Sequence, residues 1–197
     1  MVKRIFDFIF AIIGLLFLAP LFIIIAILIK IESKGPVLYK QLRVGRYNLD
    51  FKILKFRTMD MNADQLGLLT LGHSDPRITK IGYYLRKYKL DELPQLINVF
   101  IGNMSFVGPR PEVRKYVKLY NQYQMQVFKV RPGITDMASI EFRNESELLS
   151  GQEDPINYYI QEIMPKKIQI NLKYLKQRNF LKDFVVILNT FKVIIKN

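Results

Sequence analysis

The sequence predicts a mixed α/β fold that is mostly helical, with an N-terminal membrane segment followed by one small domain. Residues 8–29 form an uncharged apolar run, residues 37–56 alternate polar and apolar side chains around a polar turn, and much of the rest has helical spacing and caps. With 197 residues, the chain is long enough for one ordinary domain and short for two. We place the boundary between residues 1–34, the membrane segment, and residues 35–197, the catalytic or binding domain.

Composition excludes several classes of active site. The chain has no cysteine and one histidine, His73, which leaves no disulfide scaffold, thiolate metal site, histidine metal cluster or conventional Ser-His-Asp triad. Its formal net charge of +13 allows three kinds of partner: nucleic acid, an anionic lipid surface or a phosphorylated substrate. Because an apolar segment is attached, the lipid surface and the phosphorylated substrate are favoured.

The apolar run is long enough to cross a bilayer, since as a helix it would reach about 33 Å. Two features argue against a simple crossing. Pro20 lies near the middle, where a proline bends or breaks a helix. Lys3 and Arg4 precede the run and Lys30 follows it, and basic residues are typical of cytoplasmic flanks. From the residues alone, a single span and a re-entrant hairpin broken at Pro20 both stay open. We expect Asp7 at the interface or paired with a base.

The elements after the membrane segment follow from local patterns. Residues 37–45 and 51–56 predict a β-hairpin around the turn Arg46–Asn48. The following elements are expected in this order: a helix from near Thr58, a loop over residues 66–77, a helix capped by Thr79 as far as about Lys87, a helix from about Leu90 to Phe100 ended by Gly102, and a helix starting at Asp154-Pro155.

Two further helical features concern packing. The tyrosines at 116, 120 and 123 have helical spacing, which favours core or interface packing over a base-stacking platform. Residues 181–196 are strongly apolar with lysines at the margins, so they predict either a core helix or an amphipathic helix in the membrane interface.

The stretch 89-KLDELPQLINVF-100 places two adjacent carboxylates, Asp91 and Glu92, in the first turn of an expected helix. The simplest interpretation is structural, because the helix dipole and free N–H groups stabilise an acidic first turn by about 0.3–1 kcal/mol per residue. The alternative is chemical. A helix start binds phosphate, Arg86 adds positive charge nearby, and Mg²⁺ is held by one or two carboxylates together with substrate phosphates. An aspartate in that position can attack phosphorus.

The motif 108-GPRPE-112 presents Arg110 between Pro109 and Pro111, which restrict the loop. An arginine held in this way suits bidentate recognition of phosphate or of a base edge. Taken alone, the motif is better explained as a surface turn with a solvated arginine.

The run 75-DPRITKIGYYLRKYKLDELPQLINVFIGNMSFVGPRPE-112 closely resembles the bacterial sugar transferases known as monotopic phosphoglycosyl transferases. The resemblance covers essentially the whole chain in family order. It includes the Pro-interrupted membrane segment, 35-GPVLYKQLRVGR-46, 52-KILKFRTM-59, 131-RPGIT-135 and the apolar C-terminal helix. An ordered pattern of this length is far more specific than any single short motif.

The resemblance implies an enzyme that transfers a phosphosugar from a UDP-sugar to polyprenyl (undecaprenyl) phosphate, releases UMP, depends on Mg²⁺, and starts the assembly of an O-antigen, capsule, exopolysaccharide or glycoprotein glycan. Asp91 would be the nucleophile that forms a covalent phosphosugar intermediate. Glu92 would complete the dyad as Mg²⁺ ligand or general base, which stays open, and Asp91 is also a candidate ligand. Arg86 and Arg110 match arginines expected at the phosphates and uridine, with Pro109 and Pro111 shaping that pocket.

The resemblance also implies a topology and a set of partners. The membrane helix would be re-entrant, with both termini on the cytoplasmic face of the bacterial inner membrane, and the small domain would carry amphipathic interfacial helices. Inner-membrane lipids and downstream glycosyltransferases are the expected further partners, and nucleic acid is not expected.

The chain departs from the family pattern at three places. Ala19 precedes Pro20 where many members have serine, and Lys89 precedes the Leu-Asp-Glu core in place of a small hydroxyl residue. After Thr135, the segment 136-DMASIEFRNE-145 replaces a Gly-Trp-Ala-Gln continuation. Because that region is expected near the sugar, we take Thr135, Asp136 and Arg143 as sugar-region candidates.

A hypothesis from a different class is a non-catalytic adaptor whose basic face binds anionic lipid or nucleic acid at the membrane surface. The net charge favours it, whereas the ordered set of motifs favours the enzyme.

Overall fold

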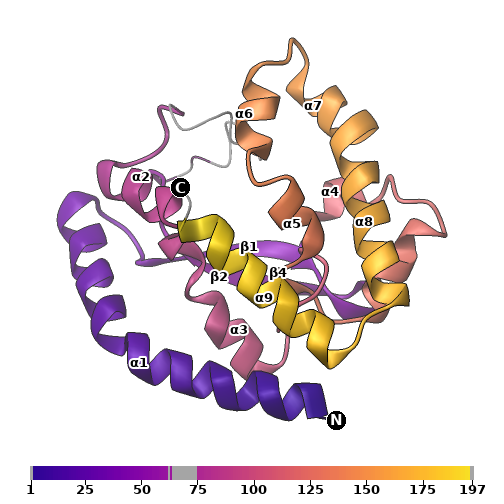
Figure 1. Ribbon diagram of the computed structural model, residues 1–197. Coiled ribbons are helices and arrows are strands. Elements are labelled where there is room, and N and C mark those ends of the chain that lie inside the picture. The colour runs from indigo at the N-terminus through magenta and orange to yellow at the C-terminus, as the bar shows by residue number, and fades with distance from the viewer. Residues whose placement is uncertain (1, 62, 64–74, 196–197) are drawn as a thin grey trace.

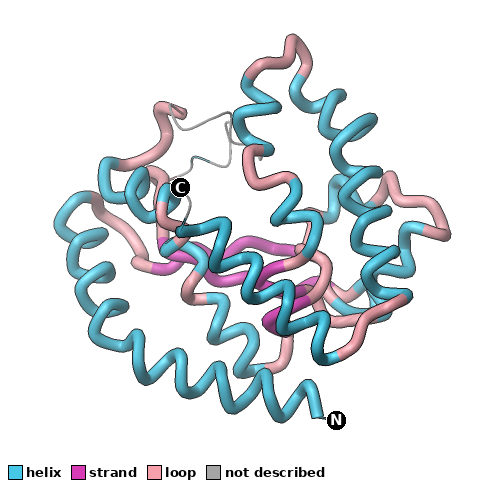
Figure 2. Tube along the Cα trace, viewed as in Figure 1, coloured by secondary structure: helices cyan, strands magenta, loops and turns pink. Residues whose placement is uncertain are grey.

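The computed structural model describes residues 2–61, 63 and 75–195, and shows two small sheets surrounded by helices (Figure 1, Figure 2). The elements in chain order are α1 (Val2–Glu32), β1 (Leu38–Val44), η1 (Arg46–Asn48), β2 (Asp50–Phe56), α2 (Lys80–Lys87), η3 (Leu90–Glu92), α3 (Gln95–Ile101), β3 (Ser105–Val107), α4 (Arg114–Val117), η4 (Gln124–Lys129), β4 (Gly133–Thr135), α5 (Met137–Glu141), α6 (Glu145–Ser150), α7 (Pro155–Tyr158), η5 (Tyr159–Ile163), α8 (Met164–Lys176) and α9 (Phe180–Ile195). Strands β1 and β2 are antiparallel, and β3 and β4 are parallel. The predicted mostly helical fold with a small sheet and a long apolar N-terminal helix is confirmed.

Helix α1 is continuous from Val2 to Glu32 although Pro20 lies inside it. The ribbon runs along the base of the molecule and then turns up its side (Figure 1). A proline bends a helix because it removes one backbone donor and crowds the preceding turn. The predicted break at Pro20 is therefore a bend within one helix.

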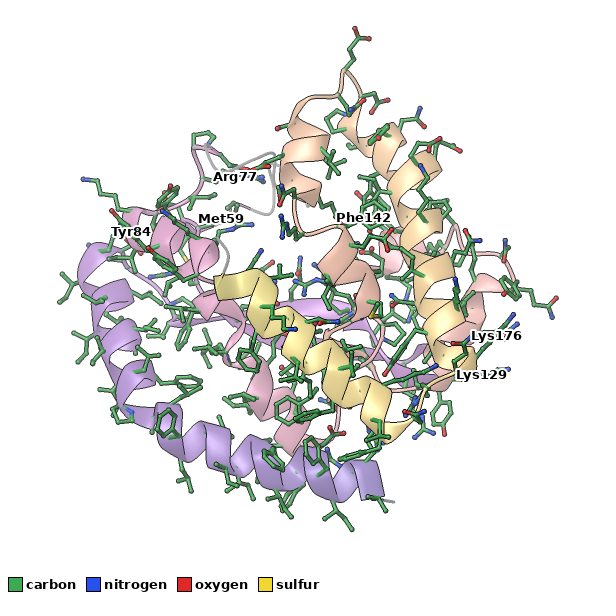
Figure 3. All side chains as sticks on the ribbon, in the orientation of Figure 1. Met59, Arg77, Tyr84, Lys129, Phe142 and Lys176 are labelled. Carbon is green, nitrogen blue, oxygen red and sulfur yellow. The ribbon has the colours of Figure 1, made fainter. Side chains whose placement is uncertain are left out.

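Helix α1 is also the described segment that is long and apolar enough to cross a membrane. Only 11% of its most apolar window is buried, whereas the core helix of a soluble protein would be mostly covered. Its side chains project away from the body of the molecule along its outer side (Figure 3). The inner side packs on α3, where the rings of Phe8 and Phe100 stack with centroids 5.2 Å apart.

The N-terminal end of α1 is attached to the rest of the domain. The Lys3 ammonium forms an ion pair with Asp183 of α9 and donates to the carbonyl oxygen of Val107 at 2.9 Å. Asp7 is buried, and its carboxylate accepts hydrogen bonds from Ser105 Oγ at 3.1 Å and from the Phe106 amide at 3.3 Å. These donors belong to β3, so Asp7 connects α1 to the parallel strand pair.

The C-terminal end of α1 is attached to the same domain. The buried guanidinium of Arg57, just after β2, donates to the carbonyl oxygens of Ser33 at 2.8 Å and Lys34 at 2.6 Å. A carboxylate oxygen of Glu32 accepts from the Ile81 amide in α2 at 3.1 Å. Both ends of the apolar helix therefore contact one domain.

The predicted β-hairpin is confirmed. Its register runs from Leu38 opposite Phe56 to Val44 opposite Asp50. The turn between the strands contains η1, in which Tyr47 has φ 59° and Asn48 has φ 61°. Asparagine tolerates this left-handed conformation better than most residues, which suits it to the turn.

No helix begins at Thr58, and residues 62 and 64–74, over which the expected helix would continue, lie outside the described residues. Met59 instead forms an antiparallel bridge with Ile78, and the Thr58 carbonyl oxygen accepts from the Thr79 amide at 3.1 Å. The greater part of the predicted loop, residues 66–74, lies outside the described residues. The predicted cap of the next helix is confirmed, because Thr79 Oγ1 accepts from the Gly82 amide at 2.9 Å.

The helix expected from Leu90 to Phe100 consists of two elements. A single 3₁₀ turn, η3, carries the acidic pair, and α3 begins only after Pro94. A proline has no N–H to continue the hydrogen-bond ladder of the preceding turn, which is the reason for the separation. Lys89 enters η3 in the left-handed conformation, and Gly102, at φ 95°, ends α3 as predicted.

The largest core cluster joins β1 to the helices on the far side of the molecule from α1. It contains Val44, Val113, Tyr116, Val117, Val127, Phe128, Leu149, Tyr159, Ile163, Met164, Ile168 and Leu172. Tyr120 packs against this cluster, whereas Tyr123 is 50% exposed, so core packing is confirmed for two of the three spaced tyrosines. The helix start at Asp154 is also confirmed, with Asp154 accepting from the Asn157 amide at 3.0 Å.

Helix α9 has one face on the domain and one apolar face exposed. Val186 is buried, and Thr190 Oγ1 lies 2.7 Å from Thr135 Oγ1 of β4. The exposed apolar residues are Phe180, Leu181, Phe184, Val185, Leu188 and Phe191. The helix thus contributes to the core on one side and leaves an uncovered apolar stripe on the other.

Candidate active site

Asp91 lies on η3, where the chain passes from α2 to α3, and its exposed fraction is only 8%. Within the part of the chain that the structure describes, no hydrogen bond engages its carboxylate. Burial raises the pKa of Asp91 above its usual value, and the positive charge of Lys55 opposes that rise. Asp91 is therefore a buried carboxylate without fixed hydrogen bonds, which is the state expected of a group that must react.

Glu92 has the opposite surroundings. Arg110 binds both carboxylate oxygens: Nη1 donates to Oε2 at 3.0 Å, and Nη2 contacts Oε1. Lys55 Nζ also donates to Oε1, at 3.0 Å. Burial raises the pKa of Glu92, but Arg110 and Lys55 outweigh this and hold the pKa well below its usual range. Glu92 is thus an ionised carboxylate with both oxygens bound by cations.

The loop that carries Arg110 is fixed through its backbone. The Arg110 amide donates to Asp136 Oδ2 at 2.6 Å, and the Gly133 amide donates to the Pro109 carbonyl oxygen at 3.1 Å. Gly108 lies so close to the next segment that an added Cβ would be 2.4 Å from the Arg131 carbonyl oxygen. The backbone around the two prolines is therefore held against β4, and the Arg110 side chain extends from it to Glu92.

Arg86 comes from the last turn of α2 and is half-buried. Burial lowers the pKa of its guanidinium, and the negative charge of Asp91 is the largest influence that opposes this. Residues from α2, η3, β2 and the 108–112 loop thus meet at one place. The predicted residues Asp91, Glu92, Arg86 and Arg110 belong to this group, with Pro109 and Pro111 on either side of Arg110.

Lys55 also belongs to this group, and the sequence-based interpretation missed it. It occupies the inward face of β2, because it follows Phe51 and Ile53 at two-residue spacing. A lysine at an inward strand position was the available signal, since such a charge is seldom buried without an acidic partner.

The sugar-region candidates lie in three different surroundings. Asp136 Oδ1 accepts from the Ser139 amide, so Asp136 caps α5 while it also holds Arg110. Thr135 contacts Thr190 through its hydroxyl group, and Arg143 lies exposed beyond α5. The last predicted residue, Pro20, is at the bend of α1.

A cavity of about 190 Å³ lies beside this group of residues, with Arg86, Pro109, Arg110 and Pro111 in its lining. Within residues 2–61, 63 and 75–195, no group of three or more acidic, histidine or cysteine side chains is placed to hold a metal ion. Mg²⁺ needs only one or two carboxylates when substrate phosphates complete its coordination, so a site at the acidic pair is compatible with this arrangement.

Comparison with known proteins gives the family. The family profile described as "Bacterial sugar transferase" matches residues 1–197. The chain is 36% identical to the UDP-glucose:undecaprenyl-phosphate glucose-1-phosphate transferase of Escherichia coli (strain K12), over 98% of this chain and 40% of that protein. It is 35% identical to the UDP-N-acetylgalactosamine-undecaprenyl-phosphate N-acetylgalactosaminephosphotransferase of Aeromonas hydrophila, over 98% of this chain and 44% of that protein.

A shorter relative is covered along most of its length. The chain is 32% identical to the exopolysaccharide production protein ExoY of Sinorhizobium fredii (strain NBRC 101917 / NGR234), over 98% of this chain and 84% of that protein. The chain thus spans less than half of the two longer relatives and most of this one. Because the family profile matches the whole length, the chain belongs to the bacterial sugar transferase family.

Proposed function

We propose that this protein transfers a phosphosugar from a UDP-sugar to polyprenyl phosphate, undecaprenyl phosphate in particular, and releases UMP. The observation that carries the proposal is the pair of neighbouring carboxylates in different states: Asp91 is buried and without a hydrogen bond among the described residues, while Glu92 is occupied by Arg110 and Lys55. The relatives named as undecaprenyl-phosphate sugar phosphotransferases support the substrate classes. Such a reaction would start the assembly of a surface glycan.

In the first step, a carboxylate oxygen of Asp91 attacks the sugar-side phosphorus of the UDP-sugar. The bond from that phosphorus to the bridging oxygen breaks, the electron pair stays on that oxygen, and UMP leaves. In the second step, a phosphate oxygen of polyprenyl phosphate attacks the same phosphorus, and the Asp91 carboxylate is released with the electron pair of its bond. The products are UMP and a polyprenyl diphosphate-linked sugar.

Arg86 and Arg110 are the groups that would bind the diphosphate, because both lie at the acidic pair and both line the neighbouring cavity. Arginine binds phosphate oxygens in a bidentate manner, and a fixed backbone makes the geometry more specific. Glu92 holds Arg110 and Lys55 in place. The occupation of both Glu92 oxygens favours this role over those of metal ligand and general base.

Asp91 is the carboxylate of the pair that is available to Mg²⁺, since both oxygens of Glu92 already accept from cationic donors. Mg²⁺ bound by Asp91 and by the donor phosphates would neutralise charge between the carboxylate and the diphosphate. Lys55 and Arg86 place positive charge beside Asp91 and so favour its ionised form.

The contacts at the two ends of α1 support a re-entrant membrane segment. Lys3 contacts α9 and β3, while the segment around Ser33 contacts Arg57, so both ends of the helix bind one domain. A straight crossing would place these ends on opposite sides of the bilayer. We therefore infer that the bent helix enters and leaves on the cytoplasmic face of the inner membrane, with the apolar stripe of α9 against the lipid.

The non-catalytic adaptor explains these observations less well. An adaptor needs its positive charge on an exposed face, whereas Lys55 and Arg110 are directed inward onto Glu92. No observation on the described residues favours a role in binding nucleic acid.

The test is release of UMP by the purified protein with Mg²⁺, a UDP-sugar and undecaprenyl phosphate. Asp91→Asn should abolish release. It should fold at least as stably as the wild type at neutral pH, because burial of the carboxylate raises the pKa of Asp91 and so disfavours its ionised form in the folded state. Intact-mass measurement after incubation with UDP-sugar alone should detect the phosphosugar adduct in the wild type. Full activity of Asp91→Asn would refute the mechanism.

A further inference from the structure

The cavity beside the acidic pair has a second wall that the proposed chemistry does not use. Arg86 and Arg110 line one side, while residues of α6 and α8 line the other. Glu145 lies at the start of α6, and Lys167 and Asn171 lie one turn apart on α8, so the latter two present the same helix face to the cavity. The volume of about 190 Å³ is smaller than that of pockets for drug-sized ligands, which start at roughly 300 Å³. The cavity therefore suits one ring group rather than a whole nucleotide sugar.

Asn171, which belongs to the lining, has a side-chain acceptor without a partner among the described residues. Its side chain is almost fully buried, and Nδ2 donates to Asp136 Oδ2 at 3.0 Å. A carboxylate oxygen only accepts, so this bond assigns the orientation of the amide. Among the described residues, the buried Oδ1 has no hydrogen-bond donor. A buried acceptor without a donor is unfavourable, which points to a hydroxyl or N–H group of a ligand as its partner.

Glu145 and Lys167 provide charged groups at the same wall. Lys167 Nζ lies 2.5 Å from Glu145 Oε2, and the pair joins α6 to α8 while both side chains are mostly buried. Sugar hydroxyl groups both donate and accept, and they form stronger hydrogen bonds with charged partners than with neutral ones. A carboxylate, an ammonium and an amide oxygen at one wall are the groups that such a ring would need.

A flat base fits this wall less well. Three tyrosines line the cavity: Tyr116, Tyr120 and Tyr159. The rings of Tyr116 and Tyr159 lie 5.0 Å apart with an interplanar angle of 58°, and the ring of Tyr120 already stacks on Phe128, so the rings of Tyr116 and Tyr159 form no parallel slot for a base. The hydroxyl group of Tyr159 is already bound to Glu112.

We propose that this cavity is the sugar subsite of the donor, with Glu145, Lys167 and Asn171 as the residues that distinguish one sugar from another. The proposal rests on the proposed function, in which Arg86 and Arg110 hold the diphosphate at the edge of the cavity. It replaces the sequence-based assignment of the sugar to Thr135, Asp136 and Arg143, because Thr135 and Asp136 are engaged in holding β4, α5 and Arg110.

The experiment measures kcat/KM of the full chain with UDP-glucose, UDP-galactose, UDP-N-acetylglucosamine and UDP-N-acetylgalactosamine, together with competitive inhibition by UMP, which lacks the transferred sugar. The variants are Lys167→Met and Asn171→Leu. Lys166→Met is the matched control, since Lys166 is the adjacent lysine of α8 and forms an exposed ion pair with Glu162 at 2.7 Å outside the cavity.

Both cavity variants should lower kcat/KM for the preferred donor by about tenfold or more, as expected for the loss of a hydrogen bond with a charged or buried group. They should also change the order of preference among the donors and leave the UMP inhibition constant unchanged, while Lys166→Met behaves as the wild type. Weaker UMP inhibition with an unchanged sugar preference would overturn the proposal in favour of a nucleoside subsite. Identical behaviour of Lys167→Met and Lys166→Met would also overturn it.

Failure of the proposed function would be recognised separately. If the wild type transferred no phosphosugar from any of these donors, calorimetric binding of the same donors and of UMP would decide. Binding that is weaker in Lys167→Met than in Lys166→Met, for the UDP-sugars but not for UMP, would retain the sugar subsite. Equal binding by both variants would remove it.

Discussion

At the scale of single residues, Asp91 and Glu92 are adjacent in the chain but have different partners. Glu92 is held by Arg110 and Lys55, whereas the Asp91 carboxylate has no hydrogen bond within the described residues. Adjacent residues of a 3₁₀ turn point in different directions, so one side chain can face the cationic groups while the other faces the reacting phosphorus. Pairs of carboxylates in contrasting surroundings commonly divide the tasks of an active site.

Glu92→Gln should reduce the free energy of unfolding by about 3 kcal/mol, as expected when one partner of a largely buried ion pair is removed. This value is the low end of the roughly 3–5 kcal/mol expected for breaking a buried ion pair, because a third of the Arg110 side chain is exposed. Folding favours ionised Glu92, whose pKa is held low, so its stabilisation is present above the usual glutamate pKa and lost as pH falls through the lowered value.

The measurement for Glu92→Gln is urea unfolding in detergent at neutral pH. Glu162→Gln is the control, since it removes an exposed i,i+4 ion pair with Lys166 and should cost only about 0.3–0.5 kcal/mol. Equal losses in the two variants would contradict the assignment of Glu92 to a buried cationic network.

Lys55→Met should move the acidic limb of the pH–rate profile to higher pH. Burial raises the pKa of Asp91, and Lys55 is the largest influence that lowers it. In the proposed mechanism Asp91 attacks as a carboxylate, so activity should rise with pH through its pKa, and loss of Lys55 raises that pKa. The measurement is kcat/KM against pH. Lys52→Met, on the exposed face of the same strand, should leave the limb in place, and a limb unmoved in Lys55→Met would count against the coupling.

At the scale of elements, the site depends on short pieces joined by unusual backbone positions. The turn η3 is entered through Lys89 at φ 55° and is separated from α3 by Pro94, which confines the acidic pair to one 3₁₀ turn. The parallel pair β3–β4 holds the loop of Arg110, and β2 supplies Lys55. None of these elements is long, so their relative positions depend on contacts with the helices around them.

Arg57 is the residue that joins the end of the membrane helix to β2. Its guanidinium donates to the carbonyl oxygens of Ser33 and Lys34, which follow the last turn of α1, and Gly35 lies against it at φ 124°. A fork of donors near the C-terminal end of a helix satisfies carbonyl groups that have no partner within the helix.

Arg57→Lys should lower the free energy of unfolding by about 2 kcal/mol, because a lysine keeps the charge but cannot reproduce the fork of hydrogen bonds. Membrane association should persist, since the apolar face of α1 is unchanged. The measurements are unfolding in detergent and flotation with lipid vesicles. Arg114→Lys is the control at a more exposed arginine that pairs with Asp50, and a similar loss there would contradict the special role of Arg57.

At the scale of the whole molecule, the bent helix α1 runs along the base and one side of the rest of the structure (Figure 1, Figure 3). The exposed apolar surfaces of α1 and α9 are where the protein would contact lipid. The labelled Lys129 and Lys176 lie on the opposite side of the molecule from Tyr84 of α2 (Figure 3). A catalytic group at the membrane surface would meet a soluble nucleotide sugar and a lipid phosphate together.

Cysteine labelling in right-side-out membrane vesicles tests the re-entrant topology. The chain has no native cysteine, so Val2→Cys and Lys34→Cys each introduce a single thiol near one end of α1. Both should resist a membrane-impermeant maleimide until the vesicles are opened, because both ends would face the cytoplasm. Phe17→Cys, on the exposed apolar surface, should react only in detergent. External labelling of Val2→Cys but not of Lys34→Cys would establish a single span instead.

By itself, the sequence determined the local features of this protein. Hydrophobic run length predicted α1, alternation predicted the hairpin, Thr79 and Asp154 predicted helix starts, and the ordered motifs predicted the family. These features depend on neighbours in the chain, so they can be seen in the order of residues.

Only the tertiary structure decided what those residues contact. It separated Asp91 from Glu92 by their partners, brought Lys55 from β2 to the acidic pair, assigned Asp136 to the support of Arg110, and fixed both ends of α1 to one domain. The physical reason is that burial, charge pairing and hydrogen bonding act between residues far apart in the chain, and spacing along the sequence does not contain those distances.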